Sequence, residues 1–170
     1  MSDKKEKRPK ITKDMVPEGF TLSLAIVDAI PVLLFAVAII ILGVKAAFSP
    51  LIMLGGFLIF LGGAIKVLWK VIVATKQKNV YWMYKQRGPV MGIGFLLLII
   101  GCIVSRSALK AAFAGIGVAS IVLFALWFVC MGLMGVFASK LDSSDPKSNW
   151  IEQCTNGVGE LCLCLALALL

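Results

Sequence analysis

The strongest constraint on this sequence is a series of apolar stretches, each long enough to cross a lipid bilayer. Residues 20–44, 51–75, 89–106 and 111–138 hold few charged side chains, and a helix needs about 20 residues to cross the hydrocarbon core. Of the 170 residues, 60% are hydrophobic and 15% are charged, and a soluble domain of this size cannot bury so much apolar surface in one core. The sequence therefore predicts an all-α, polytopic membrane helix bundle of four to five spans, arranged in antiparallel hairpins with short loops.

The stretch at residues 150–170 is more polar, because it includes Glu152, Gln153, Asn156 and Glu160. From Trp150 onward it is long enough to span, whereas the apolar residues after Glu160 would cross only about half of the membrane. A helix that stopped there would leave the terminal carboxylate in hydrocarbon, at a cost of several kcal/mol. We therefore expect a fifth span. A re-entrant helix or a truncated span is the alternative.

The basic residues indicate the orientation. Residues 1–19 form a basic tail, which we expect to be flexible or to lie on the lipid headgroups. This tail, residues 76–87 and residues 139–149 share one side of the predicted bundle, and they hold six, four and two Lys or Arg. The opposite side holds Lys45, Arg106 and Lys110. The positive-inside rule then predicts a cytoplasmic N-terminus in a cell membrane, and the net charge of +8 predicts binding to anionic lipid headgroups, not to nucleic acid.

The sequence offers little for catalysis. It contains no His, and its five Cys are scattered without a CxxC pair. Imidazole metal sites, His proton relays and Ser-His or Cys-His catalysis are thereby excluded. We also find no metal-ligand set, nucleophile–base pair or phosphate-binding loop. We expect no cofactor and no enzyme activity, and a membrane enzyme is the weakest of the hypotheses.

One group of polar residues could form a site inside the membrane. Asp28 and Lys66 each lie 19 residues from the hairpin turn near Ala47, so an antiparallel hairpin brings them level. If the last span starts at Trp150, Glu160 and Asn156 reach a similar depth. Two carboxylates and one Lys would make a net negative site that suits a cation or a proton.

Pro31 would support this site, because it has no N–H and leaves the carbonyl of Val27 free beside Asp28. We expect the substitution Asp28→Asn to abolish transport and to leave folding mostly intact. In the alternative interpretation, Lys66 and Lys70 extend toward the headgroups, or Asp28 and Lys66 only join two helices.

Small residues predict how the helices meet. Gly55 and Gly62, and likewise Gly56 and Gly63, are seven residues apart, so each pair shares a helix face. Spacings of four residues put Gly92 in line with Gly88, and Gly115 in line with Ala111 and Ala119. Because apolar surfaces gain little by associating in lipid, close approach through small residues stabilises helix pairs there. We expect these glycines to pack helices together, with a glycine-lined permeation path as the alternative.

A short internal similarity is also present. The sequence Lys45-Ala-Ala-Phe48 recurs as Lys110-Ala-Ala-Phe113, and both copies are expected at hairpin turns. A duplicated two-helix unit would explain it, but the flanking residues match poorly, so coincidence is the simpler explanation.

Two functions remain from different classes. The first is a small transport or permeation protein that handles a cation or a proton at the Asp28 site. The second is a non-catalytic accessory, assembly or regulatory subunit whose glycine-rich faces dock a partner membrane subunit or a second copy of the chain. Asp28, Lys66 and Glu160 around a polar cavity would favour transport.

Overall fold

The computed structural model describes residues 11–170 as an all-helical bundle, which confirms the predicted fold class. The long helices are α1 (Leu22–Lys45), α2 (Pro50–Lys76), α4 (Arg87–Val104), α6 (Val118–Lys140) and α7 (Pro146–Ala168). Two short helices, α3 (Tyr81–Lys85) and α5 (Arg106–Phe113), flank α4. Four segments are long and apolar enough to cross a membrane, namely α1, α2, the α3–α4 segment and α6. The chain is therefore a multi-pass membrane protein.

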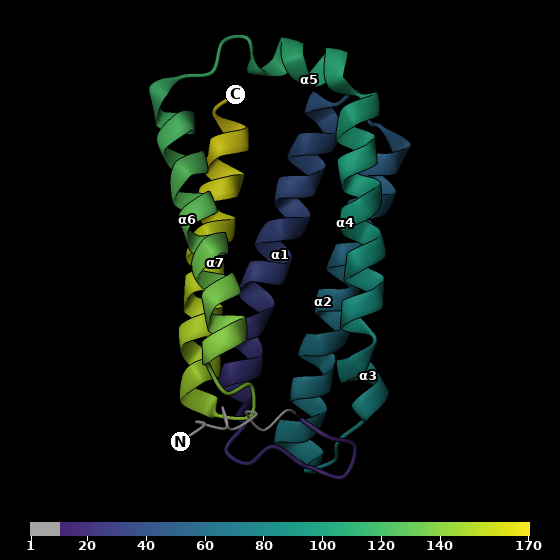
Figure 1. Cartoon of the computed structure of the whole chain (residues 1–170), viewed down its shortest axis with the longest axis vertical. Coiled ribbons are helices and arrows are strands. Elements are labelled where there is room, and N and C mark those ends of the chain that lie inside the picture. Colours follow the sequence, from purple (N-terminus) through teal and green to yellow (C-terminus); the bar gives the residue numbers. More distant parts are fainter. Residues whose placement is uncertain (1–10) are drawn as a thin grey trace, which may run out of the picture.

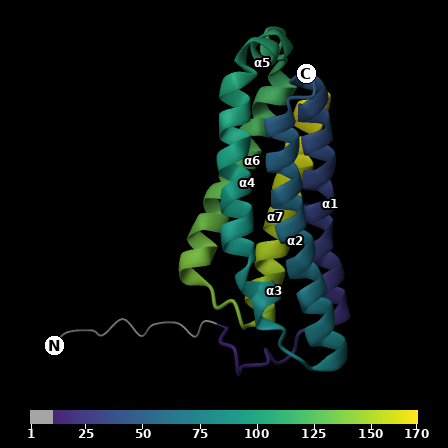
Figure 2. The same cartoon turned by 90° about the vertical axis from the view of Figure 1, so that its right-hand side faces the viewer.

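The long helices form a bent row in the order α4, α2, α1, α7, α6 (Figure 1). Each helix packs against its neighbours in this row. Within residues 11–170, no Cα atom of α4 lies within 8 Å of one in α6. Figure 2 shows α4 and α6 on one side of the molecule and α1 on the other. The two end helices therefore each have one long neighbour, which leaves most of their surface free.

Helix α7 contains residues 150–168, most of the stretch for which the sequence predicts a fifth span. It is continuous over 23 residues, and it runs beside α1 from the end that holds the α6–α7 link to the opposite end (Figure 1). It is not one of the four strongly apolar segments. Because α1 and α6 flank it, polar side chains such as Gln153 and Glu160 are buried within the protein. A re-entrant helix is not what the structure shows.

Glycines allow α2 to approach both of its neighbours. An added Cβ at Gly55 would lie 2.6 Å from the backbone N of Leu98 in α4, and one at Gly101 would lie 2.7 Å from the backbone N of Ile52. On the face of α2 that meets α1, a Cβ added at Gly56 would instead meet the side chain of Ile39. The backbones of α2 and α4 therefore come close at positions that lack a side chain, and the glycines facing α1 make room for side chains of α1.

The predicted packing glycines behave in two ways. Gly62 packs against Met91 of α4, and Gly63 packs against Val32 of α1. By contrast, a Cβ added at Gly92 or Gly115 would have no atom of another segment within 4 Å among the described residues 11–170. Within residues 11–170 these two glycines do not pack helices together, and their packing against a partner helix stays a prediction.

The end of the bundle near α5 differs from the predicted boundaries. Residues 106–113 do not extend the neighbouring spans but form α5, which lies across the end of the bundle (Figure 1). Helix α4 accordingly ends at Val104, and α6 begins at Val118. The repeated four-residue sequence also takes two shapes: Ala47 and Phe48 have φ values of 52° and 55° in the α1–α2 turn, whereas the second copy is helical in α5. It is therefore not a repeated turn.

The segments expected on one side of the membrane do meet at one end of the bundle. Asn79, in the α2–α3 loop, donates hydrogen bonds to backbone carbonyls of the N-terminal segment. An added Cβ at Gly19 would lie 3.0 Å from Pro146, at the start of α7. We call this the basic end, because it carries most of the Lys and Arg of residues 11–170.

The packing of glycines between helices can be tested by comparing two alanine substitutions. We expect Gly55→Ala to destabilise the bundle by about 1–3 kcal/mol, because the new methyl group meets the α4 backbone. Gly92→Ala meets open space and should be neutral or slightly stabilising. Unfolding in detergent, followed by circular dichroism, measures both. Equal stability of the two variants would contradict the packing described here.

The contacts of Asp145 at the start of α7 predict that the stability of the bundle depends on pH. The hydroxyl and backbone N–H of Ser148 donate to the carboxylate of Asp145, and they hold the pKa of this carboxyl below its usual value. The stabilisation is therefore present at neutral pH and is lost as the pH falls through the pKa of the folded state. We expect Asp145→Ala to flatten the acid limb of a plot of unfolding midpoint against pH. An acid limb as steep as that of the unchanged protein would contradict this assignment.

Candidate functional site

The candidate site lies between α1 and α2 near the basic end. On α2, the face that meets α1 carries Gly56, Gly63 and Lys70, each seven residues from the next. The two glycines hold the helices close together, so Lys70 is directed at α1. Asp28 lies six residues after the start of α1, and Lys70 lies six residues before the end of α2. The antiparallel hairpin therefore brings them level.

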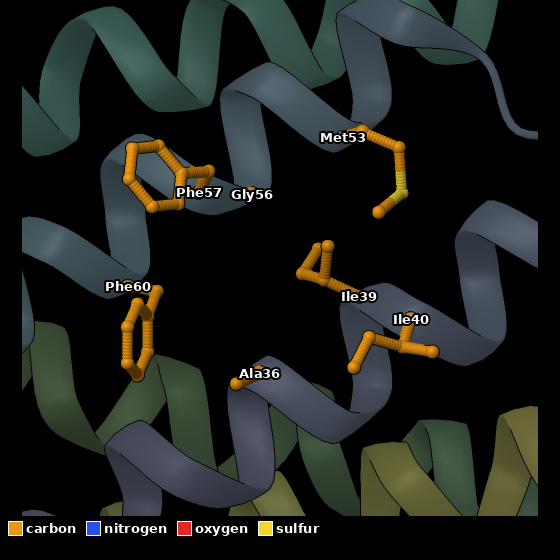
Figure 3. A pocket seen from close by; sticks show the side chains of 7 residues that line it. All are labelled: Ala36, Ile39, Ile40, Met53, Gly56, Phe57 and Phe60. Atoms are coloured by element: carbon orange, nitrogen blue, oxygen red, sulfur yellow. The ribbon is translucent and has the colours of Figure 1, made fainter.

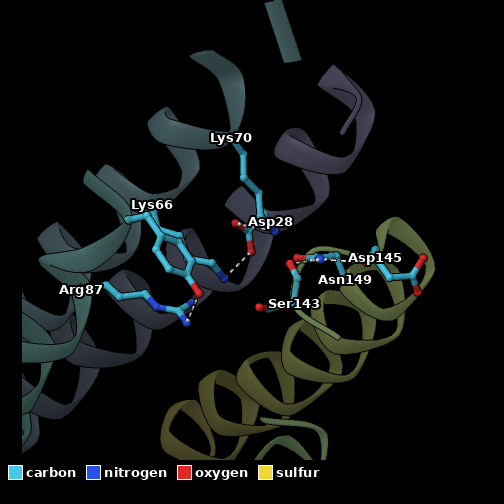
Figure 4. A network of polar contacts seen from close by, with 8 residues as sticks. Asp28, Lys66, Lys70, Arg87, Ser143, Asp145 and Asn149 are labelled. Atoms are coloured by element: carbon cyan, nitrogen blue, oxygen red, sulfur yellow. Dashed lines mark hydrogen bonds and ion pairs between the residues drawn. The ribbon is translucent and has the colours of Figure 1, made fainter. Parts of the chain in front are cut away.

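One carboxylate lies between two ammonium groups at this site (Figure 4). The Nζ of Lys70 is 3.1 Å from Oδ2 of Asp28, and the Nζ of Lys66 is 3.3 Å from Oδ1. Asp28 is 2% exposed and Lys70 is 1% exposed, whereas the side chain of Lys66 is 18% exposed. The charges stabilise one another where water is scarce, because an isolated charge buried there would cost several kcal/mol. We call these three residues the ion cluster.

An aromatic side chain covers the ion cluster. The ring of Phe20 lies 5.7 Å from the Nζ of Lys70, within reach of a cation–π contact. The same ring packs edge-on against Trp69, at 6.0 Å between ring centroids. Phe20 is itself only 4% exposed. It separates Lys70 from the surroundings of the basic end.

Phe20 belongs to an N-terminal segment that packs against the bundle. The side chain of Asn79 donates to the carbonyls of Thr12 (2.9 Å) and Met15 (2.6 Å), and it accepts from Nε1 of Trp69 (2.9 Å). Ile11 is 3% exposed and packs in the same apolar cluster as Trp69. Residues 11–19 therefore pack against the bundle and are not a free tail, whereas their contact with lipid headgroups stays a prediction. Residues 1–10 lie outside the described part of the chain.

Glu160 and Asn156 do not join the ion cluster. Glu160 is buried on the side of α7 that meets α6, where it faces Trp127. Its neighbour Gly159 packs against Cys130 of α6. Asn156 is partly buried on α7, and among residues 11–170 it makes no side-chain hydrogen bond to Asp28 or to either lysine of the cluster.

The charge of the site is therefore the reverse of the prediction. The sequence predicts two carboxylates around one Lys, and the structure places two lysines around one carboxylate. The further carboxylate that acts on Lys70 is Glu152 of α7, from beyond ion-pair distance. Spacing along α2 could have identified Lys70, because it continues the seven-residue series of Gly56 and Gly63. The ion cluster thus does not match a cation or proton site.

The surroundings of the ion cluster limit its chemistry. Within residues 11–170 no group of three or more Cys, Asp or Glu is placed to hold a metal ion. Two cavities of about 170 and 240 Å³ lie between α1 and α2, but their linings are apolar. Figure 3 shows the first, with Ile39 of α1 facing Met53, Phe57 and Phe60 of α2. Neither cavity is lined by a residue of the ion cluster.

Comparison with known proteins found no matching family model, no similar curated protein and no similar solved structure.

The two ion pairs of Asp28 change what we expect for the stability of a variant that lacks its carboxylate. We expect Asp28→Asn to destabilise the bundle by about 3–5 kcal/mol, because two buried ammonium groups lose their partner. This replaces the expectation that folding stays mostly intact. Denaturant titration in mixed micelles measures the change, and Asn156→Ala on α7 serves as a control that leaves the cluster untouched. A loss no larger than that of the control would show that the cluster does not join the helices.

Proposed function

We propose that the chain is a non-catalytic component of a membrane assembly, an accessory, assembly or regulatory subunit that docks a partner helix through α6. The observation that supports this most is the free surface of α6. Of its 23 residues only Ser120 is buried, and α7 is the one described helix that packs against it. A helix so little covered by its own chain offers a long surface to another membrane protein.

The free face of α6 has a pattern suited to another helix. Val122, Val129 and Val136 are seven residues apart and are 52%, 60% and 43% exposed. The small residues Ala125, Gly132 and Ser139 follow each valine by three positions and are exposed as well. Such a seven-residue repeat of branched and small side chains matches the spacing by which two helices interdigitate. Lipid tails require no such repeat.

The orientation and location follow the charge of the basic end. Because that end holds most of the Lys and Arg, we propose that it faces the cytoplasm of a cell membrane and contacts anionic headgroups. The partner is another membrane subunit or a second copy of this chain.

Transport is the second candidate, because the ion cluster lies in two apolar helices long enough to span a membrane. Charged side chains in a spanning helix are costly, so they often serve a substrate or ion path. Here, however, the charges contact one another, and the two cavities between α1 and α2 are apolar. A flux of cations or protons across proteoliposomes that hold the unchanged protein, and not across empty liposomes, would favour transport over docking.

The docking proposal is tested by photocrosslinking in native membranes. A photoreactive amino acid at Val129 should give a discrete protein adduct, whereas one at Leu96, on the lipid-exposed side of α4, should give lipid adducts. Gly132→Leu should reduce the adduct at Val129 by about tenfold, since a clash that costs about 1.4 kcal/mol has that effect. It should not unfold the chain, because no other segment of residues 11–170 lies within 4 Å of a Cβ added at Gly132. Lipid adducts alone at Val129 would contradict the proposal.

A further inference from the structure

The N-terminal segment and the ion cluster together carry an inference that is independent of the docking role. Residues 11–20, which we call the strap, cross the basic end outside any helix. Only Ile11, Pro17 and Phe20 of the strap are anchored deeply, whereas Thr12, Lys13, Asp14, Glu18 and Gly19 are exposed. A segment with few buried contacts opens more readily than a packed helix.

Asn79 holds the strap in place. Its amide group donates to the carbonyls of Thr12 and Met15, while its own carbonyl accepts from Trp69. The hydrogen bond from the backbone N of Met15 to the carbonyl of Thr12 stays within the strap. The polar attachment between the strap and the α2–α3 loop thus depends on one side chain.

The strap covers a cluster whose contacting charges do not balance. Lys66 and Lys70 share the single carboxylate of Asp28. Glu152 of α7 acts on Lys70 from a greater distance and makes no ion pair with it within 4.0 Å in the described chain. When Phe20 is in place, it shields the ammonium of Lys70. If Phe20 withdraws, that ammonium is open at the end of the bundle where lipid phosphates are expected.

We propose that the strap is a releasable cover, held by Asn79, over a binding site for phosphate groups formed by Lys66 and Lys70. The ligand is a phosphate, carried by a lipid headgroup or free in solution, because an oxyanion accepts hydrogen bonds from two ammonium groups. Asp28 keeps the two lysines in place on the inner side. Lys66 lies four residues farther from the basic end than Lys70, and its side chain is already 18% exposed.

The test is the labelling of lysines by an amine-reactive acetylating reagent, followed by mass spectrometry, on the full chain in maltoside micelles without phosphate. In the unchanged protein Lys70 should label far more slowly than Lys78, which is exposed. Asn79→Ala should raise the labelling rate of Lys70 about tenfold, because two hydrogen bonds that close the strap are lost. Lys78 should label at the same rate in both proteins.

Controls separate opening of the strap from unfolding. Thr75→Ala, which removes only a hydrogen bond within α2, should leave Lys70 protected. Phe20→Leu keeps the Asn79 contacts but removes the aromatic cover, so it should raise labelling of Lys70 even if Asn79→Ala does not fold. Fast labelling of Lys70 in the unchanged protein would overturn the proposal that the strap covers this residue. Slow labelling of Lys70 in both Asn79→Ala and Phe20→Leu would overturn it as well.

The ligand is tested on the opened variant. Inorganic phosphate, or vesicles of phosphatidylglycerol, should restore the protection of Lys66 and Lys70 in Asn79→Ala. Protection by both indicates a site for any phosphate group, and protection by vesicles alone indicates a headgroup site. If neither protects the two lysines relative to Lys78, the phosphate site is overturned.

Discussion

The pairing of one buried carboxylate with two ammonium groups is the constraint on which the basic end of this bundle depends. Asp28 and Lys70 are almost fully buried, and neither charge is tolerable there without the other. The contact also fixes how α1 and α2 meet. The glycines that let the two helices approach lie on the same face of α2 as Lys70, so close packing and charge pairing require the same rotation of the helix. Close packing and charge pairing together therefore set the register of the α1–α2 hairpin.

The remainder of the basic end is arranged around this contact. Phe20 lies against Lys70, and Trp69 joins Phe20 to Asn79, which in turn holds the N-terminal segment. Burial of polar groups against protein also explains the position of α7, because its polar side chains would be costly to expose to lipid. It lies inside the row, between α1 and α6, so its buried carboxyl at Glu160 faces protein. Helix α6 is the opposite case, because it is apolar and mostly uncovered.

Much of the fold could be predicted from the sequence, because span length and apolar composition are nearly sufficient to identify helices in lipid. Counting from the turn also placed Asp28 level with Lys66. Counting residues from a turn gives the depth of a side chain along its helix but not the rotation of that helix about its axis. The rotation decides which side chains of two helices meet. Lys70 was therefore left out of the predicted site, and Glu160 was expected beside Asp28. The packing of the N-terminal segment depends on Asn79, a residue more than sixty positions away in the chain, and no local pattern indicates such a contact.

The most direct test of this account is a double-mutant cycle between Asp28 and Lys70, with Asp28→Asn and Lys70→Met measured singly and together by denaturant titration in mixed micelles. If the two side chains form the contact that joins α1 to α2, their effects on the free energy of unfolding are coupled by about 1 kcal/mol or more, since residues in direct contact are not additive. If the effects add to within about 0.5 kcal/mol, as for distant sites, the buried ion cluster does not hold the basic end together.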